Sequence, residues 1–320
     1  GLNAFNRNTG KFERYLNSDK EKNVLNGNGI FVVKKAKNNK LWLGYFGQQI
    51  SRFDPGTRTN EPFLYDNTPF SFKGWSIRDI IEAQDGTVWI ATFGQGLFKY
   101  VQENNQFHQF MPGENSISDS KIFDLEEDSQ GNIWIANLST GLSKYNPKNE
   151  SFTHIKYNQD ITDGLPENTL RCIRYEGDNT LWIGTYSSGL CKYNKKTGKF
   201  KTYTKQQGLP DNTILGILFD DNNNLWMSTN NGITKFNQNT GEVTSYDVSD
   251  GIQGKDFNIL SYFKAKDGYM YFGGPNGLTV FHPDSIKPNP YLSVVVIKDL
   301  KLFNRKVHVG DSVNNRVLLE

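Results

Sequence analysis

The sequence predicts an all-β fold assembled from a repeated unit, on three observations. A tryptophan-containing phrase recurs as "VWIATFGQGLFKY", "IWIANLSTGLSKY", "LWIGTYSSGLCKY" and "LWMSTNNGITKF". Each unit holds four short runs rich in Val, Ile, Leu, Thr and aromatic residues, and almost none reaches the ~10 residues that would indicate a helix. Gly, Asn and Asp separate the runs, as tight hairpin turns require. Four strands per unit form a blade, and blades must stack around an axis to bury both faces, so the sequence predicts a β-propeller.

The aromatic residue of each phrase sets the period of the repeat. Successive positions are 47, 45, 48, 44 and 45 residues apart. A period of about 40 to 50 residues fits a propeller blade or a two-helix solenoid unit, and the four strands favour the blade. We expect these aromatic rings to fill the space between neighbouring blades rather than to bind a ligand. They are Trp42, Trp89, Trp134, Trp182 and Trp226, with Tyr271 in the sixth place.

The strands of one unit follow in a fixed order. In the second full unit they are "IRDIIEA", "VWIAT", "GLFKYV" and "QFHQF". Turns such as "QDGT" and "SQGN" join the first two strands, and turns such as "NTGKF" and "NKKTGKF" join the last two. These residue types tolerate the positive φ that a two-residue hairpin needs. The unit is therefore an antiparallel meander.

The N-terminal segment matches only the second half of a unit. Residues 1–20 contain "GLNAFNRNTGKFERYL", which is similar to "GLCKYNKKTGKFKTYT" in a later repeat. We expect the tryptophan strand of this half blade to lie upstream of residue 1. With the six later repeats, it predicts a seven-bladed propeller over residues 1–287 with an incomplete first blade. A six-bladed ring, in which the N-terminal strands complete the last blade, stays open.

Residues 288–320 depart from the repeat. The prolines of "FHPDSIKPNP" break any strand, and "YLSVVVIKDLKLFNRKVHVG" follows. These residues are too few for a sandwich of about 100 residues. We interpret them as a linker and the truncated start of a second β domain.

Composition excludes several classes of function. The 320 residues carry 36 Lys and Arg against 34 Asp and Glu, a net charge of +2 with no clustering, so no nucleic-acid partner is predicted. No apolar run approaches the ~20 residues that cross a bilayer, so this segment is not expected to insert into a membrane. The two cysteines, Cys172 and Cys191, fall on strands two ladder spacings apart, too far for a disulfide. We expect both to be buried free thiols.

Residues suited to catalysis or metal binding are sparse. His108 and His154 fall on fourth strands, at the outer edge of a blade, and the other two histidines lie near the C-terminal end. No catalytic residue, cofactor or metal site is predicted. The acidic cluster around Asp220 and Asp221 lacks the glycine and distal glutamate of an EF-hand loop and occupies an ordinary hairpin.

A binding surface is the remaining candidate. Loops after the second and fourth strands share one rim of a propeller, and here they carry aromatic residues and long loops. Trp75 is the only tryptophan outside the repeat and the first choice for a ring that stacks on a ligand. The full set of rim candidates is Tyr45, Phe46, Trp75, Phe93, Gln95 and Tyr186.

Two arginines complete the candidate site. Arg78 and Arg171 each stand 11 residues before their tryptophan, where other units have Phe or Leu. They indicate a polar or anionic feature near the axis. The alternative is that they pair with local acids such as Asp79.

Three stretches of the sequence are typical of a known family of repeats. They are the tract "DSQGNIWIA", the following "GLSKYN" and the linker "GLTVFHPDSIKPNPY". The chain resembles the two-component regulator propeller repeats of the periplasmic sensor region of Bacteroides-type hybrid two-component systems. In that family the linker leads into an Ig-like (triple-tyrosine) β-sandwich. The segment "VVVIKDLKLFN" is similar to the opening strand of that domain. The resemblance covers essentially the whole chain.

The resemblance implies a non-catalytic periplasmic sensor module, part of an inner-membrane histidine kinase. Such a module binds an oligosaccharide, assembles with a second propeller of the same parent chain, or does both. The Ig-like domain of the parent chain is a further expected partner, and a homodimer is left open. The alternative from another class is a propeller-fold polysaccharide lyase or glycan hydrolase.

Overall fold

The computed structural model describes residues 1–17, 25–46, 50–62, 76–103 and 106–287, with short strands at 300–302, 305–307, 312–313 and 316–317. The chain divides into two compact units, Gly1–Pro283 and Asp284–Glu320. Strands dominate the described residues, and the helical segments among them are single 3₁₀ turns. These turns are η1 (Lys37–Asn39), η2 (Lys205–Gln207), η3 (Val248–Asp250) and η4 (Pro283–Ser285). No helix in the described part of the chain is long and apolar enough to cross a membrane.

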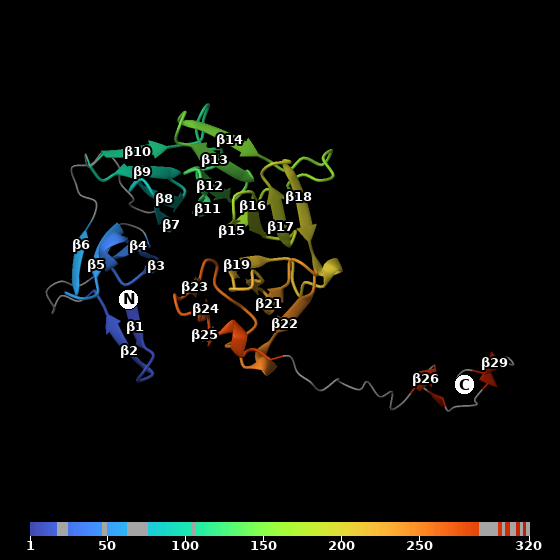
Figure 1. Ribbon diagram of the computed structural model, residues 1–320. Coiled ribbons are helices and arrows are strands. Elements are labelled where there is room, and N and C mark those ends of the chain that lie inside the picture. The colour runs from blue at the N-terminus through green and yellow to red at the C-terminus, as the bar shows by residue number, and fades with distance from the viewer. Residues whose placement is uncertain are drawn as a thin grey trace. The chain divides into compact units, whose positions relative to one another are not determined.

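The first unit contains six sheets of three or four strands around a common axis (Figure 1). The first sheet consists of β3 (Ile30–Lys35), β4 (Leu41–Tyr45), β5 (Ile50–Asp54) and β6 (Thr59–Pro62). The second consists of β7 (Ser76–Glu82), β8 (Val88–Phe93), β9 (Leu97–Val101) and β10 (Gln106–Phe110). The third consists of β11 (Ile122–Glu127), β12 (Ile133–Asn137), β13 (Leu142–Asn146) and β14 (Ser151–Ile155). The others are β15 (Leu170–Glu176), β16 (Thr180–Thr185), β17 (Leu190–Asn194) and β18 (Lys199–Tyr203); β19 (Ile214–Phe219), β20 (Leu225–Thr229), β21 (Gly232–Phe236) and β22 (Val243–Tyr246); and β23 (Tyr262–Lys264), β24 (Met270–Gly274) and β25 (Gly277–Phe281). Each sheet is an antiparallel meander, as the turn sequences predict.

The structure shows six blades rather than the predicted seven. The N-terminal strands β1 (Leu2–Asn6) and β2 (Lys11–Tyr15) form a separate two-stranded sheet, because no inner strands pair with them among the described residues. The six-bladed alternative required these two strands to pair with the last sheet, and they do not. The hairpin instead packs between the first and last sheets through side chains. Tyr15 meets Phe53 at 5.1 Å between ring centres, and Arg7 pairs with Asp267 and covers the ring of Tyr269.

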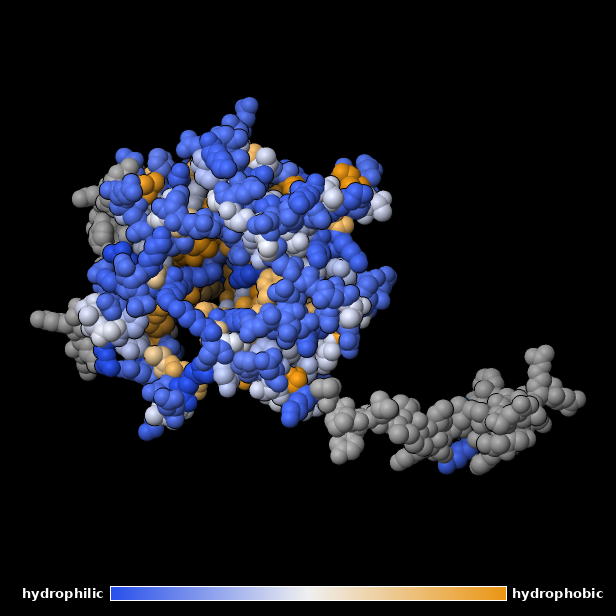
Figure 2. Space-filling view, in the orientation of Figure 1, coloured by the Kyte–Doolittle hydropathy of each residue, from blue (hydrophilic) through white to orange (hydrophobic). Residues whose placement is uncertain are grey.

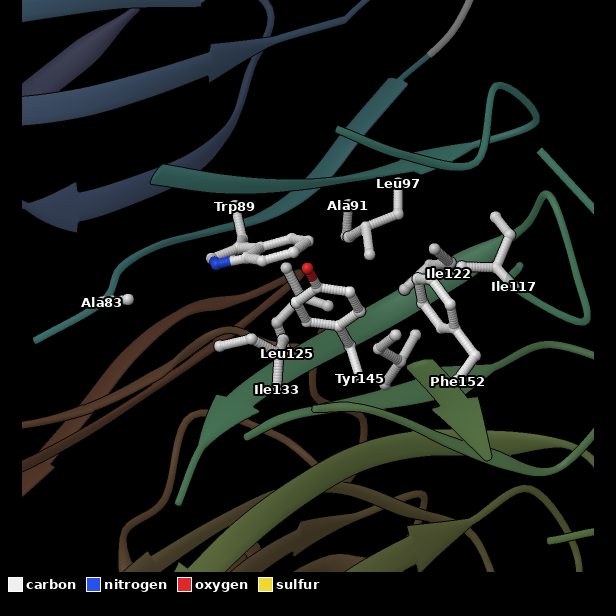
Figure 3. Packing of buried hydrophobic residues seen from close by; sticks show 11 residues of the cluster. Ala83, Trp89, Ala91, Leu97, Ile117, Ile122, Leu125, Ile133, Tyr145 and Phe152 are labelled. Carbon is white, nitrogen blue, oxygen red and sulfur yellow. The ribbon is translucent and has the colours of Figure 1, made fainter. Parts of the chain in front are cut away.

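Large aromatic side chains fill the spaces between blades. Trp89 of β8 packs against Tyr145 of β13, with 4.9 Å between ring centres, and Phe152 joins the same cluster (Figure 3). The five repeat tryptophans are at most 3% exposed, whereas Tyr271 on the last sheet is half-buried. Burying an aromatic residue of this size removes a large apolar area from water, so each tryptophan ties its blade to the next.

The repeated tract before each tryptophan has a local role in the hairpin. In "DSQGNIW", the Asp128 carboxylate accepts hydrogen bonds from the backbone N–H of Asn132 and from the indole Nε1–H of Trp134, both at 3.0 Å. Asp220 does the same for Asn224 and Trp226. Within the acidic cluster, Asp220 therefore caps a turn and orients the buried indole, whereas Asp221 pairs with Lys264.

The second unit contains two short hairpins among its described residues. They are β26 (Leu300–Leu302) with β27 (Arg305–Val307), and β28 (Ser312–Val313) with β29 (Arg316–Val317). Most of the predicted opening strand of an Ig-like domain, "VVVIKDLKLFN", lies outside the described residues, and the described ones form only these two-stranded sheets.

Candidate functional site

A β-bulge in the innermost strand of each complete blade places one residue at the axis. In β3, β7, β11, β15 and β19 the pairing with the second strand skips a single residue. A bulge leaves its extra residue out of the ladder and turns its side chain in a new direction. In the last sheet Leu260, just before β23, takes the equivalent place with a left-handed φ of 60°. We call these six residues the axial ring: Phe31, Arg78, Phe123, Arg171, Leu215 and Leu260.

The axial ring borders a cavity of about 860 Å³. All of its members except Phe123 line the wall. Loop residues and the last sheet add aromatic and polar side chains. They are Tyr186, Thr213, Asn230 and Asn258 from loops, Tyr262 from β23 and Tyr271 from β24. The space-filling view shows the central opening, with hydrophobic residues on its wall (Figure 2). The volume and mixed lining suit a small organic ligand of several rings.

The two ring arginines have aromatic neighbours but no anionic partner. The guanidinium carbon of Arg78 lies 4.7 Å from the ring centre of Phe93 and 5.1 Å from that of Phe31. The guanidinium carbon of Arg171 lies 4.7 Å from the ring centre of Phe123 and 4.6 Å from that of Tyr186. Both Nε atoms are buried without a hydrogen-bond partner. Neither guanidinium makes an ion pair with any residue that the structure describes.

Burial acts on both arginines in the same direction, whereas neighbouring groups act on them in opposite directions. Burial lowers the pKa of both; the charge of Arg171 lowers the pKa of Arg78 further, while Tyr186 and the carboxylate of Glu167 raise that of Arg171. Arginine nevertheless stays protonated in proteins, because its ordinary pKa is far above neutral. The alternative, pairing with local acids such as Asp79, gives no ion pair among the described residues, and Asp79 pairs with Lys34 at 2.8 Å. The cavity wall therefore carries two positive charges that make no ion pair with the described residues.

A network of buried charges lies beside this cavity and joins the inner strands. A second cavity, of about 540 Å³, shares Phe31, Arg78 and Leu260 with the first and is lined by part of this network. The Nη1 atom of Arg174 on β15 lies 3.2 Å from the carboxylates of both Asp124 and Glu126 on β11. Its Nη2 atom donates to the hydroxyl of Tyr262 on β23 at 2.7 Å. The sequence pattern did not reveal this network, because residue types differ between blades at its positions. Lys34, Glu126 and Arg174, for example, each pair with the tryptophan of their own blade.

The aspartates of the network also bond backbone groups of the next blade. Asp79 on β7 accepts from the N–H of Leu125 at 3.1 Å, and Asp124 on β11 accepts from the N–H of Ile173 at 2.9 Å. Burial raises the pKa of Asp124 to about 7, with the charge of Asp79 adding to the effect and that of Arg174 opposing it. One carboxylate oxygen of Asp124 has no partner. Adjacent blades are thus locked by carboxylate-to-backbone bonds near the axis.

The predicted rim residues fall into three groups. Tyr186, 51% exposed, lines the cavity, and Phe93 contacts both Arg78 and Phe123, so these two lie at the axial ring. Phe46 is exposed and stacks on Phe31, with 5.6 Å between ring centres. Gln95 lies in a turn, and its backbone carbonyl accepts a hydrogen bond from the side chain of Gln109. Tyr45 is 3% exposed and bonds Ser51 in the core, and Trp75 lies outside the described residues.

Groups that could support other chemistry are placed away from this cavity. His154 bonds Ser143 on the neighbouring strand of its own blade, and His108 lies on the outer strand β10. No cluster of three potential metal ligands occurs in the described ranges. Cys172 and Cys191 are buried free thiols, as expected.

Comparison with known proteins identifies the repeat. Residues 116–139 and 208–231 match the family model described as two component regulator propeller. "Histidine kinase P4" of Formosa agariphila is 28% identical over 309 residues, which cover 92% of this chain and 22% of the kinase. The chain therefore spans about a fifth of the length of that curated relative.

Solved structures agree on the fold. The extracellular domain of a hybrid two component system from B. thetaiotaomicron superimposes with a TM-score of 0.72 at 25% identity, covering 82% of this chain and 34% of that one. Virginiamycin B lyase from Staphylococcus aureus gives a TM-score of 0.56 at 14% identity, covering 81% of this chain and 85% of the lyase. The second likeness shows the propeller fold alone.

Proposed function

We propose that this chain, which carries two-component regulator propeller repeats, is a non-catalytic extracytoplasmic sensor module that binds an oligosaccharide in the cavity at the axial ring. The matching repeats and the extracellular domain of similar structure support the sensor role and the location outside the cytoplasm. In the parent protein, the module would pass its signal to a histidine kinase across the inner membrane. A second propeller and an Ig-like domain of the same parent chain are its proposed partners.

The lining of the cavity is the observation that carries the binding proposal. Saccharides are bound by aromatic rings that stack on their apolar faces and by planar polar groups that bond their hydroxyls. Tyr186 offers such a ring, and the side chains of Asn230 and Asn258 offer amides at the same cavity. No histidine or carboxylate lines the described wall of this cavity, which supports binding over acid–base catalysis.

Calorimetric titration with a panel of defined oligosaccharides tests this function. We expect saturable binding by at least one saccharide, and Tyr186→Ala should weaken it roughly fivefold, the effect of losing about 1 kcal/mol of stacking. The matched control is Tyr157→Ala, because Tyr157 is 48% exposed but lies outside the cavity. Phe93→Ala should likewise weaken binding, since the ring supports Arg78.

Two results would contradict the proposal. Absence of binding across the whole panel would show that the cavity is not a saccharide site. Release of saccharide products during incubation would instead support the lyase or hydrolase alternative, and mutation of the residues at the axis would then locate its active groups.

A further inference from the structure

Two basic residues beside the cavity, Arg174 and Lys34, are each paired with acidic side chains. Arg174, three residues after Arg171 on the same strand, bonds Asp124, Glu126 and Tyr262. Lys34 pairs with Asp79 at 2.8 Å. A buried charge is costly unless it is paired and hydrogen-bonded, and these two residues follow that rule.

Arg78 and Arg171 depart from this rule at the same position of two blades. Four other blades place Phe31, Phe123, Leu215 and Leu260 there, so the fold itself does not require a cation. Aromatic faces contact both guanidiniums, but a cation–π contact offsets only part of the lost hydration. The described residues lining the cavity include no Asp, Glu or Lys. Two cations that form no ion pair with any described residue therefore face a cavity that can hold a ligand.

We infer that the ligand of this cavity is an anionic oligosaccharide, whose carboxylate or sulfate groups bind the guanidiniums of Arg78 and Arg171. This inference rests on the proposed function and specifies its ligand class. Guanidinium groups form planar, two-pronged hydrogen bonds with carboxylates and with sulfate-like oxyanions, and Nε is one of the donors that such pairing uses. The buried Nε atoms that lack partners are therefore donors that an anionic substituent would satisfy.

The rest of the cavity fits a sugar that carries these groups. The ring of Tyr186 lies beside the guanidinium of Arg171, so one saccharide unit could stack on the tyrosine while its acidic substituent meets the arginine. Thr213, Asn230 and Asn258 provide polar side chains for neutral hydroxyls elsewhere on the wall. Both arginines rest on the ring of Phe123, which holds them at one end of the cavity.

The test is calorimetric titration of the protein with matched charged and neutral saccharides. The probes are tetragalacturonate, its methyl ester, a sulfated carrageenan tetrasaccharide, its desulfated form and inorganic sulfate. Arg78→Gln and Arg171→Gln remove one charge each, and Arg171→Lys keeps it without the planar fork. Arg58→Gln is the control, because Arg58 is exposed and pairs with Glu13 far from the cavity wall.

We expect a charged saccharide to bind at least about tenfold more tightly than its neutral partner, and each Arg→Gln variant to lose about tenfold or more of that affinity. Raising the salt concentration should weaken this binding, and Arg58→Gln should leave it unchanged. The carboxylated and sulfated probes distinguish the two anionic groups. The melting temperature of the ligand-free variants should not fall, because the guanidiniums make no ion pair with the described residues and glutamine relieves the burial of a charge.

Other outcomes separate this inference from the proposed function. Equal affinity for charged and neutral saccharides, or unchanged affinity in both Arg→Gln variants, would overturn the anionic ligand and leave the saccharide sensor standing. A fall of several degrees in the melting temperature of the variants would show that the arginines are structural and would also overturn it. Binding of inorganic sulfate alone would overturn the assignment to a saccharide. No binding of any saccharide would overturn both.

Discussion

Replacing Trp134 with alanine should lower the free energy of unfolding by about 4–6 kcal/mol. The indole is 3% exposed and packs against Tyr193 of the next blade, so its removal leaves a cavity that costs about 3–5 kcal/mol. The N–H bond to the Asp128 carboxylate adds about 1 kcal/mol, which is below the about 1.5–3 kcal/mol usual for bonds to charged groups. The low value applies because Asp128 keeps Lys195 and Asn132 as partners.

Urea unfolding, monitored by circular dichroism, measures this loss of stability. Two further variants separate the contribution of packing from that of the hydrogen bond. Trp134→Phe keeps most of the ring and loses the N–H donor, so it should cost about 1–2 kcal/mol. Tyr271→Ala changes the equivalent residue of the last sheet, which is half-buried, and should cost less than Trp134→Ala. If Trp134→Ala unfolds at the wild-type urea concentration, the ring does not hold the blades together. If Trp134→Phe is as costly as the alanine variant, packing is not the main contribution.

Two further predictions concern the axis. Because the pKa of Asp124 is raised to about 7 in the folded protein, the folded state holds a proton that the unfolded state has released between about pH 4 and 7. Stability should therefore fall as pH rises through this window, and Asp124→Asn should flatten that slope in melts recorded across it; an unchanged slope would contradict the shift. Gly216→Ala should destabilise the protein, because its Cβ would lie 2.0 Å from the ring of Tyr262. Gly241→Ala, with no atom within 4 Å of its Cβ but a φ of +77°, measures the cost of backbone strain alone.

The repeated positions were predictable from sequence because each has the same role in every blade. Four short strands, the tryptophan and the turn residues recur, so their period gives the blade and its antiparallel order. The number of blades could not be predicted from the repeat in the same way. A half unit at residues 1–20 counts as a blade in sequence, but in the structure its two strands gain no inner partners and remain a hairpin against Phe53 and Tyr269.

The candidate site was predictable where it departs from the repeat. Arg78 and Arg171 stood out because apolar residues occupy the same place elsewhere, and the bulges explain why that place faces the axis. Tyr45 could not be separated from Phe46 by sequence. Tyr45 is the last residue of β4 and enters the core, whereas Phe46 follows the strand and stays exposed. The pairing of Arg174 with three partners needed the coordinates, since they lie 48, 50 and 88 residues away.

The axial ring also indicates how a bound ligand would act on the whole propeller. Arg78 and Arg171 come from blades separated by the β11–β14 sheet, so an anion held by both would connect two blades across the one between them. Strand β15 carries Arg171 at the cavity and, three residues later, Arg174, which is bonded to β11 and β23. A shift of β15 on ligand binding would therefore change contacts in three sheets. A signal that begins at this cavity would be read as a change in blade packing rather than as the movement of one loop.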